Sequence, residues 1–361
     1  MQKNIKVTKS FIPPISEFTS YVERCFKNEW LTNRGELVLE LEDKLSNHLQ
    51  LDLSKILITN NGTVPLQIAI KLLANRGEVI TTPFSYIATT SAIAWEDCTP
   101  VFVDINPEYL TIDETKIEAA ITNKTTCILA THVFGNPCNI EEIDRIAKKH
   151  NLFVIYDAAH CFGVQYQGKS IFEYGDISTC SFHATKLFHT CEGGAIFCKD
   201  PALFQRIYYS HNFGHDGPSN FKGVGINAKI SEVHAAMGLA VLPYIASIVS
   251  GRKRVVDFYN KNISFINRRK INIRENTEWN YSYYFIIFDT EEELLKVLSK
   301  LNSSLIEPRR YFYPSLNLVD YVKGRSMPIS ESISKCILCL PLYFDLKEVE
   351  MSKIVQIINE T

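Results

Sequence analysis

Residues 125–157, TTCILATHVFGNPCNIEEIDRIAKKHNLFVIYD, place a helical pattern between two apolar runs. The runs at 125–132 and 151–157 are rich in β-branched and aromatic residues and are bounded by turn formers, which predicts strands. The intervening IEEIDRIAKK, 140–149, predicts a helix. A strand, a helix and a second strand form the unit from which parallel sheets are built.

The same alternation extends from about Leu57 to Phe197. Further strand candidates are KILIT (55–59), GEVITT (77–82), TPVFVD (99–104), DISTCSF (176–182) and GAIFC (194–198). Helix candidates include VPLQIAIKLL (64–73), IATTSAIAW (87–95) and TIDETKIEAAI (111–121), in which Thr111 and Glu114 have capping-box spacing. We therefore predict an α/β fold whose large domain holds a mostly parallel seven-stranded sheet flanked by helices.

After Ile230 the pattern changes to a long helical stretch, 231–263, which we expect to bend or break near Pro243. A strand candidate (282–288), a helix (291–301), a strand (336–340) and a final helix (347–359) follow. These elements predict a smaller α+β C-terminal domain. We place the large domain at 1–245 and the small domain at 246–361, and the N-terminal segment can join either.

Composition excludes some classes of function. The chain has 361 residues, 46% of them hydrophobic and 22% charged, with a formal net charge of -2, so we expect no nucleic-acid partner. The N-terminal MQKNIKVTKSFIPP has no apolar segment after its lysines, and the longest apolar run, Cys336–Phe344, contains Pro341. We expect a cytoplasmic protein without a membrane partner, with its ten cysteines reduced.

Two pairs of residues have metal-ligand spacing. Cys336 and Cys339 lie in an apolar run that predicts a buried strand, in which residues three apart point to opposite faces. His211 and His215 are separated by Gly214 in a stretch that predicts a loop. We interpret the cysteines as core packing and expect no metal site.

Three groups follow predicted strands, where the carboxyl ends of parallel strands collect ligands. Gly62 and Thr63 begin a helix after the first strand, which suits a phosphate but is also a plain turn. Asp157 ends the strand at 151–157 and could hold a pyridine nitrogen protonated, or merely cap a strand. Lys186 could form a Schiff base with a carbonyl cofactor or be an ordinary surface lysine. In this chain order the three groups together predict a pyridoxal phosphate (PLP) site.

Seven motifs carry a resemblance to a known protein family. They are NGT (61–63), TTPFSYIAT (81–89), HVFGNPC (132–138), YDAAH (156–160), SFHATK (181–186), EGGA (192–195) and GIN (225–227). In order and spacing the chain resembles the DegT-type sugar aminotransferases, fold-type I PLP-dependent transferases that act on nucleotide-linked keto sugars. The resemblance runs from residue 30 to residue 314. Some relatives are dehydratases with histidine at the Schiff-base position, whereas this chain keeps Lys186.

The resemblance implies a role for each matching residue. Lys186 would form the Schiff base with PLP and Asp157 would pair with its pyridine nitrogen, so these two are the predicted catalytic residues. His160 would lie near the phenolate oxygen of the cofactor, where many relatives have glutamine. Tyr86 would stack on the ring, although core packing is an alternative for this residue.

The resemblance also implies a phosphate site and a shared dimer. Gly62, Thr63 and Ser181 would bind the cofactor phosphate. Asn227 would reach the phosphate of the neighbouring subunit's cofactor, which implies a homodimer with shared active sites. For Ser181 and Asn227 the alternative is an ordinary polar residue at a turn or strand end.

The loop EPRRYFYP, 307–314, provides the predicted substrate contacts Arg309, Arg310, Tyr311 and Tyr313. Arginine suits a pyrophosphate and tyrosine suits a sugar or base, although both arginines could be ordinary residues of an interdomain loop.

The resemblance implies glutamate as amino donor and C4 of TDP-4-keto-6-deoxy-D-glucose as acceptor. The product would be TDP-4-amino-4,6-dideoxy-D-glucose, a sugar of lipopolysaccharide O-antigen biosynthesis. C3 amination of a TDP-3-keto-6-deoxyhexose and a non-catalytic PLP-binding regulator are the alternatives. Ala228 and His234, where relatives often have glycine and glutamine, weaken the substrate assignment.

Overall fold

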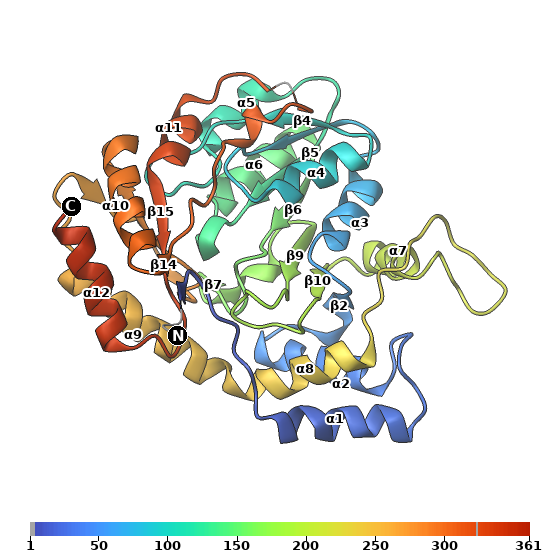
Figure 1. Cartoon of the computed structure of the whole chain (residues 1–361). Helices are drawn as coiled ribbons and strands as arrows, with labels where there is room; N and C mark the ends of the chain where they lie inside the picture. Colours follow the sequence, from blue (N-terminus) through green and yellow to red (C-terminus); the bar gives the residue numbers. More distant parts are fainter. Residues whose placement is uncertain (1–3, 323) are drawn as a thin grey trace.

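A seven-stranded sheet forms the centre of the larger part of the chain (Figure 1). The computed structural model describes residues 4–322 and 324–361, so residues 1–3, with which the predicted large domain begins, lie outside the described part. The strand order is β2-β10-β9-β6-β5-β3-β4. Only β10 runs antiparallel to its neighbours among these strands, which confirms the mostly parallel sheet and all seven strand candidates. The strands are β2 (Ile56–Thr59), β3 (Glu78–Thr81), β4 (Thr99–Phe102), β5 (Thr125–Thr131), β6 (Phe153–Asp157), β9 (Ile177–Ser181) and β10 (Gly194–Phe197).

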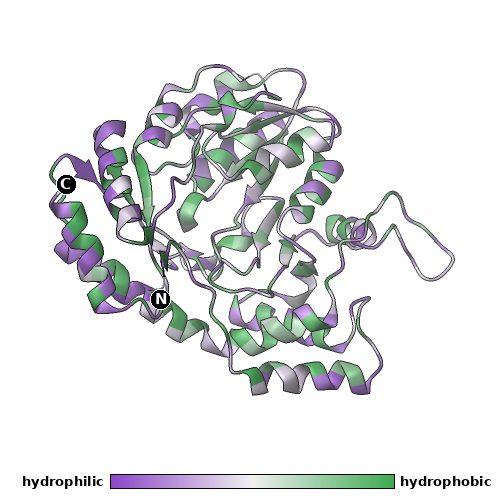
Figure 2. Cartoon of the chain, viewed as in Figure 1, coloured by the Kyte–Doolittle hydropathy of each residue, from purple (hydrophilic) through white to green (hydrophobic). Residues whose placement is uncertain are grey.

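Helices cover both faces of this sheet because the strands are apolar on both sides. In β6, for example, Ile155 packs into one apolar cluster while Val154 and Tyr156 pack into the other. The first cluster is covered by α3 (Val64–Leu73), α4 (Ile87–Trp95) and α7 (Pro201–His211), and the second by α2 (Glu36–His48), α6 (Ile140–His150) and α8 (Glu232–Val241). Helix α1 (Ile15–Lys27) packs on α8. Outer helices such as α1 and α12 alternate hydrophobic and hydrophilic residues (Figure 2).

The second part of the chain has its own antiparallel sheet and apolar core. Its sheet has the order β11-β13-β15, and β1 near the N-terminus pairs in parallel with β14. The elements are β1 (Ile5–Lys6), α9 (Ile245–Asn262), β11 (Arg268–Arg269), β13 (Tyr284–Phe288), α10 (Glu291–Ser303), β14 (Ile306–Glu307), α11 (Pro328–Cys336), β15 (Ile337–Leu340) and α12 (Glu348–Asn359). Ile245 and Ile248 of α9 pack into the large core, whereas Val255 and Tyr259 pack into the smaller one. The division at residue 245 stays a prediction.

The chain also contains short helices and strands. They are η1 (Leu53–Lys55), η2 (Glu114–Lys116), α5 (Ile117–Ala120), η3 (Val133–Gly135), β7 (Gln165–Tyr166), β8 (Lys169–Ser170), η4 (Ile171–Glu173), η5 (Leu242–Tyr244), β12 (Thr277–Glu278) and η6 (Leu316–Leu318). Strand β12 adds to the β7–β8 hairpin of the large domain. Just beyond it, Trp279 and Ser282 donate hydrogen bonds to the carbonyl of Phe134 at 2.9 and 2.8 Å. The two domains are therefore joined beside the carboxyl ends of β5 and β6.

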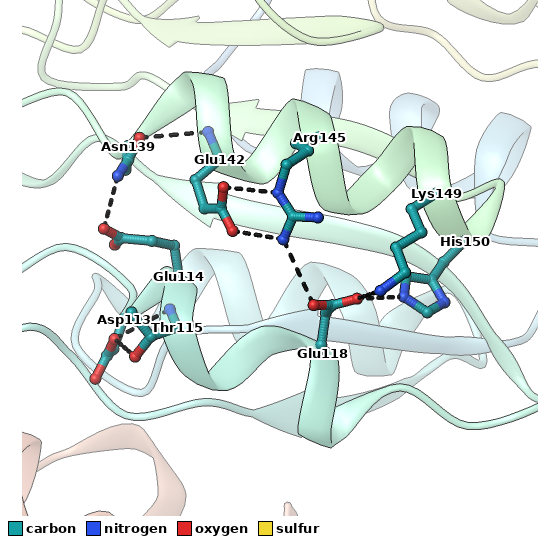
Figure 3. Close-up of polar contacts among 9 residues, drawn as sticks. All are labelled: Asp113, Glu114, Thr115, Glu118, Asn139, Glu142, Arg145, Lys149 and His150. Atoms are coloured by element: carbon teal, nitrogen blue, oxygen red, sulfur yellow. Dashed lines mark hydrogen bonds and ion pairs between the residues drawn. The ribbon is translucent and has the colours of Figure 1, made fainter.

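The predicted capping box at 111–121 is wrong. The cap is Asp113, which accepts hydrogen bonds from the backbone N–H and the hydroxyl of Thr115, because an aspartate competes well for amides two residues ahead. Glu114 instead accepts from Asn139 of α6 at 2.8 Å. Next to this contact lies a surface network of ion pairs, in which Glu118 accepts hydrogen bonds from Lys149 and other basic residues of α6 (Figure 3).

Two other predictions need correction. Cys339 lies in β15 as expected, but Cys336 ends α11, because the strand begins only at Ile337. The stretch Glu232–Asn262 is, by length and composition alone, apolar enough to cross a membrane, a property that no run was expected to have. In the fold it is interrupted by η5 at Pro243, as predicted, and α8 packs against α1 and α2. The core helix of a globular protein meets the same criterion.

Candidate active site

A cavity of about 330 Å³ lies at the carboxyl ends of the parallel strands, facing the small domain. Eight of the predicted residues line it: Gly62, Thr63, Tyr86, Asp157, His160, Ser181, Lys186 and Tyr311. They arrive from the β2–α3 loop, the N-terminus of α4, the ends of β6 and β9, and the small domain. Larger cavities of about 500 and 760 Å³ are lined, within the described chain, by other residues except for the shared Tyr283.

Asp157 is the buried acid of this cavity. It ends β6, and its carboxylate accepts hydrogen bonds from the Thr89 hydroxyl at 2.6 Å and from the backbone N–H of Ala159 at 3.2 Å. Burial raises the pKa of Asp157, while these two hydrogen bonds and the charge of Lys186 act to lower it. The ionised form is thus stabilised by a few specific partners.

Lys186 lies in the turn after β9 and is half-buried, less enclosed than a deeply buried amine. Its backbone N–H donates to the carbonyl of His183 at 2.8 Å, which fixes the turn. The ammonium group lies 3.4 Å from the hydroxyl of Tyr283 and 5.9 Å from the centre of that ring. Lys186 therefore faces the cavity with a small-domain tyrosine as its neighbour.

His160 is held as a neutral ring. Its Nδ1 accepts the backbone N–H of Phe134 at 3.1 Å, so the ring proton resides on Nε2. Burial, together with the charge of Lys186, keeps the pKa of His160 well below its usual value. Phe134 itself has a left-handed backbone, with φ 59°, and makes the hydrogen bonds to the small domain described above. The HVFG stretch thus positions His160 and joins the domains.

The β2–α3 loop and the end of β9 build another part of the cavity lining. A Cβ on Gly62 would lie 2.7 Å from Cβ of Ser181, so only glycine fits between these two segments. Asn61, which belongs to the NGT motif but was given no role from the sequence, accepts the backbone N–H groups of Thr63 and Val64 at 2.8 and 2.9 Å. The hydroxyls of Thr63 and Ser181 line the same cavity.

Tyr86 is 59% exposed and lines the cavity, so the core-packing alternative is wrong for this residue. It occupies the N-cap position of α4, so its backbone is fixed at the start of that helix.

Four predicted residues do not line the cavity in this chain: Asn227, Arg309, Arg310 and Tyr313. Asn227 is exposed and its side chain accepts from Lys229 at 2.8 Å. The guanidinium of Arg310 donates to Glu291 at 2.6 Å and to the carbonyl of Lys335 at 2.9 Å.

Arg310 also stacks 3.8 Å from the centre of the Tyr313 ring. Arg309 is exposed. Burial raises the pKa of the Tyr311 hydroxyl to about 12, and the positive charge of Arg309 acts in the opposite direction.

The residues present fit PLP. The cavity has the size of a small-molecule site, with a carboxylate and an amine among its lining residues and a glycine that leaves no room for a side chain at the helix end. No cluster of three or more histidine, cysteine or acidic side chains suited to a metal occurs among the described residues. The predicted roles of the individual residues stay predictions.

Several lining residues were missed by sequence reasoning. Thr131 ends β5 directly beside Asp157 in the strand register and could have been found as a strand-end hydroxyl. Ser85 adjoins Tyr86 in a quoted motif. Tyr283 comes from the small domain, and nothing in the local sequence indicates that it reaches the cavity.

Comparison with known proteins extends over the whole chain. A model of the DegT/DnrJ/EryC1/StrS aminotransferase family matches residues 15–359. The chain is 39% identical over 367 residues to the dTDP-4-amino-4,6-dideoxy-D-glucose transaminase of Shigella dysenteriae, with 100% of both chains covered. It is 33% identical to the GDP-perosamine synthase of Escherichia coli O157:H7, with 94% of each covered. The crystal structure of DesI in the presence of its TDP-sugar product superposes with a TM-score of 0.93 at 27% identity, covering 100% of this chain and 93% of that one.

Proposed function

The chain belongs to the DegT/DnrJ/EryC1/StrS aminotransferase family and is a PLP-dependent sugar aminotransferase, and we propose that it transfers the amino group of glutamate to C4 of TDP-4-keto-6-deoxy-D-glucose. The products are TDP-4-amino-4,6-dideoxy-D-glucose and 2-oxoglutarate. The observation that carries the choice of sugar is the 39% identity, over both entire chains, to a transaminase named for that amino sugar. The regulator alternative has weaker support, since the pleiotropic regulatory protein of Geobacillus stearothermophilus is 29% identical over 83% of this chain.

The residues of the cavity divide the work. PLP, when bound, carries the amino group and supplies the electron sink. Lys186 is the amine that would hold the cofactor covalently, and as a free amine it would take and return the proton at the substrate carbon. Asp157, as a carboxylate, would hold the pyridine nitrogen protonated. His160 would offer its Nε2–H as a donor to the phenolate oxygen, and Gly62, Thr63 and Ser181 would receive the phosphate.

Within the loop 307–314 we assign the pyrophosphate contact to Arg309. Arg310 already pairs with Glu291 and stacks on Tyr313, so releasing it would break both contacts. Arg309 is exposed beside Tyr311, which lines the cavity, and an arginine fork suits a diphosphate. Tyr311 then faces the sugar.

We propose that two copies of the chain form a homodimer. After α7 the chain projects from the body of the molecule as a loop (Figure 1). Phe213, Phe221, Val224 and Ile226 on this projection are 40–78% exposed, an apolar surface that a second copy would cover. Asn227 pairs with Asn212, which directly follows α7, and therefore lies where the projection leaves the body of the molecule. The same contact would bring Asn227 to the partner's cofactor. Phe221→Asp together with Val224→Asp should yield monomers by sedimentation, and unchanged dimers would refute the proposed interface.

The function is tested with purified protein, PLP, glutamate and a panel of 4-keto and 3-keto hexoses linked to TDP, GDP and UDP. The proposal requires the highest kcat/KM for TDP-4-keto-6-deoxy-D-glucose, with 2-oxoglutarate formed in equal amount. Lys186→Ala should lose turnover and the absorbance of covalently held PLP while keeping the circular dichroism of the wild type. A higher kcat/KM for a 3-keto sugar, or full activity of Lys186→Ala, would overturn the assignment.

A further inference from the structure

A chain of buried hydroxyl groups ends on Asp157. The Thr131 hydroxyl donates to Ser85 at 3.2 Å, Ser85 and Thr89 lie 2.8 Å apart, and Thr89 donates to Asp157 at 2.6 Å. All four residues are buried, with exposures of 0–5%. Each hydroxyl is therefore shielded from bulk water by its burial, and Ser85, Thr131 and Asp157 also line the cavity.

The acceptor at the end fixes the direction of every proton in this chain. An ionised carboxylate only accepts, so the single hydroxyl proton of Thr89 goes to Asp157. Ser85 must then donate to Thr89, and Thr131 donates to Ser85. Three dipoles in series point at one carboxylate, and hydrogen bonds aligned in this way strengthen one another.

The chain also links Asp157 to the wall of the cavity. Thr131 and Asp157 are direct neighbours in the β5–β6 register, while Ser85 and Thr89 lie one turn apart at the start of α4. Tyr86, which lines the cavity, lies between them in sequence. The same turn of α4 thus presents Tyr86 to the cavity and the Thr89 hydroxyl to Asp157.

We propose that Thr89, supported by Ser85 and Thr131, is a positioning residue that keeps Asp157 ionised and oriented toward the cofactor's pyridine nitrogen. This role rests on the proposed function, because it presupposes PLP in the cavity. It differs from general structural support in that it acts on the charge of one carboxylate.

Few groups near Asp157 stabilise its ionised form. Burial raises its pKa, and the Thr89 hydroxyl is the first of the contacts that lower it, ahead of the Ala159 amide and the charge of Lys186. The other titratable groups nearby are neutral: burial keeps the pKa of His160 low, that of Cys161 high and that of Cys180 at about 12. Loss of the Thr89 hydroxyl therefore favours the protonated acid.

The chain offers a matched control in the adjacent residue. Thr90 is equally buried in α4, and its hydroxyl has no hydrogen-bond partner in the described part of the chain. Thr89→Val and Thr90→Val make the same change of shape on the same helix, but only the first removes a donor to Asp157. Thr89→Ser retains the hydroxyl and serves as the rescue.

The experiment titrates each apo-protein with PLP and follows the absorbance of the bound cofactor and the PLP dissociation constant from pH 5 to 9. We expect Thr89→Val to bind PLP about tenfold more weakly and its acid limb of binding to move to higher pH, since a charge-assisted hydrogen bond is lost. Thr89→Ser should lie near the wild type, and Thr90→Val should match it.

Two outcomes separate the possible failures. Wild-type protein that binds no PLP would refute the proposed function itself. Wild-type protein that binds PLP, with Thr89→Val and Thr90→Val giving the same dissociation constants and pH profiles, would overturn the role of Thr89. If Thr89→Val does not fold, Ser85→Ala provides the test, because it interrupts the same chain one step further from Asp157, and unchanged pH dependence there would equally overturn the proposal.

Discussion

Gly62→Ala tests how closely the β2–α3 loop packs against the end of β9 in the cavity lining. The added Cβ would lie 2.7 Å from Cβ, 2.8 Å from Oγ and 3.0 Å from Cα of Ser181. Carbon atoms in good contact are about 3.5–4.0 Å apart, so the two segments must separate by roughly 1 Å. Overpacking of this size costs about 1–3 kcal/mol of unfolding free energy. We expect weaker PLP binding as well, because both segments line the predicted phosphate site.

The assay is urea unfolding of the apo-protein combined with PLP titration, for Gly62→Ala, Ser181→Gly and the double variant. Ser181→Gly removes two of the three clashing atoms, so the double variant should be more stable than the sum of the single effects by about 1 kcal/mol or more. PLP binding should not recover, since the Ser181 hydroxyl is absent. An unfolding midpoint of Gly62→Ala equal to that of the wild type, or strictly additive effects, would refute the reasoning.

Three further predictions concern separate parts of the chain. Arg309→Ala should raise KM for the nucleotide sugar about tenfold or more and leave the free energy of unfolding unchanged. Arg310→Ala should lose about 1–3 kcal/mol of stability, because its contact with Glu291 is removed, and should keep the wild-type KM. Kinetics and unfolding curves that show the two effects exchanged would contradict this assignment. His160→Gln should retain the absorbance of bound PLP, because an amide N–H can replace Nε2–H, while His160→Leu should alter it; identical spectra would argue against the donor role. Lys149, His150 and Arg145 lower the pKa of Glu118 from 4.5 to about 2, so its ionised form stabilises the fold above pH 4.5 and this contribution is lost as the pH falls toward 2. The difference in melting temperature between wild type and Glu118→Gln should therefore shrink over that range, and a constant difference would count against the ion pairs.

The sheet could be predicted from sequence because each strand is a short apolar run closed by turn formers. NGT follows β2, whose described sheet neighbour is the antiparallel β10, so its place at the cavity depends on the full strand order. Asp157 ends β6, which pairs in parallel with β5 and β9, so its position at the carboxyl edge of the sheet could be predicted from sequence. The position of Lys186, shortly after the end of β9, could be predicted for the same reason. Local pattern and global fold agree at these positions.

The rest depends on contacts between distant segments. Tyr283 reaches Lys186 only because the small domain docks on the HVFG stretch, and no local pattern encodes that docking. The cap predicted at Thr111 is formed by Asp113 instead, and this choice depends on the local backbone geometry, which the spacing of Thr111 and Glu114 does not reveal. The role of Arg310 in the fold likewise depends on Glu291, which lies nineteen residues away on α10.

The most direct test of the proposed function follows the nitrogen atom itself. Purified protein with PLP, TDP-4-keto-6-deoxy-D-glucose and ¹⁵N-labelled glutamate should yield a sugar nucleotide whose ¹⁵N couples to the proton on C4 in the NMR spectrum. The same mixture with Lys186→Ala should show no labelled sugar. A label on C3, or label that stays in glutamate while the wild-type protein holds PLP, would contradict the account.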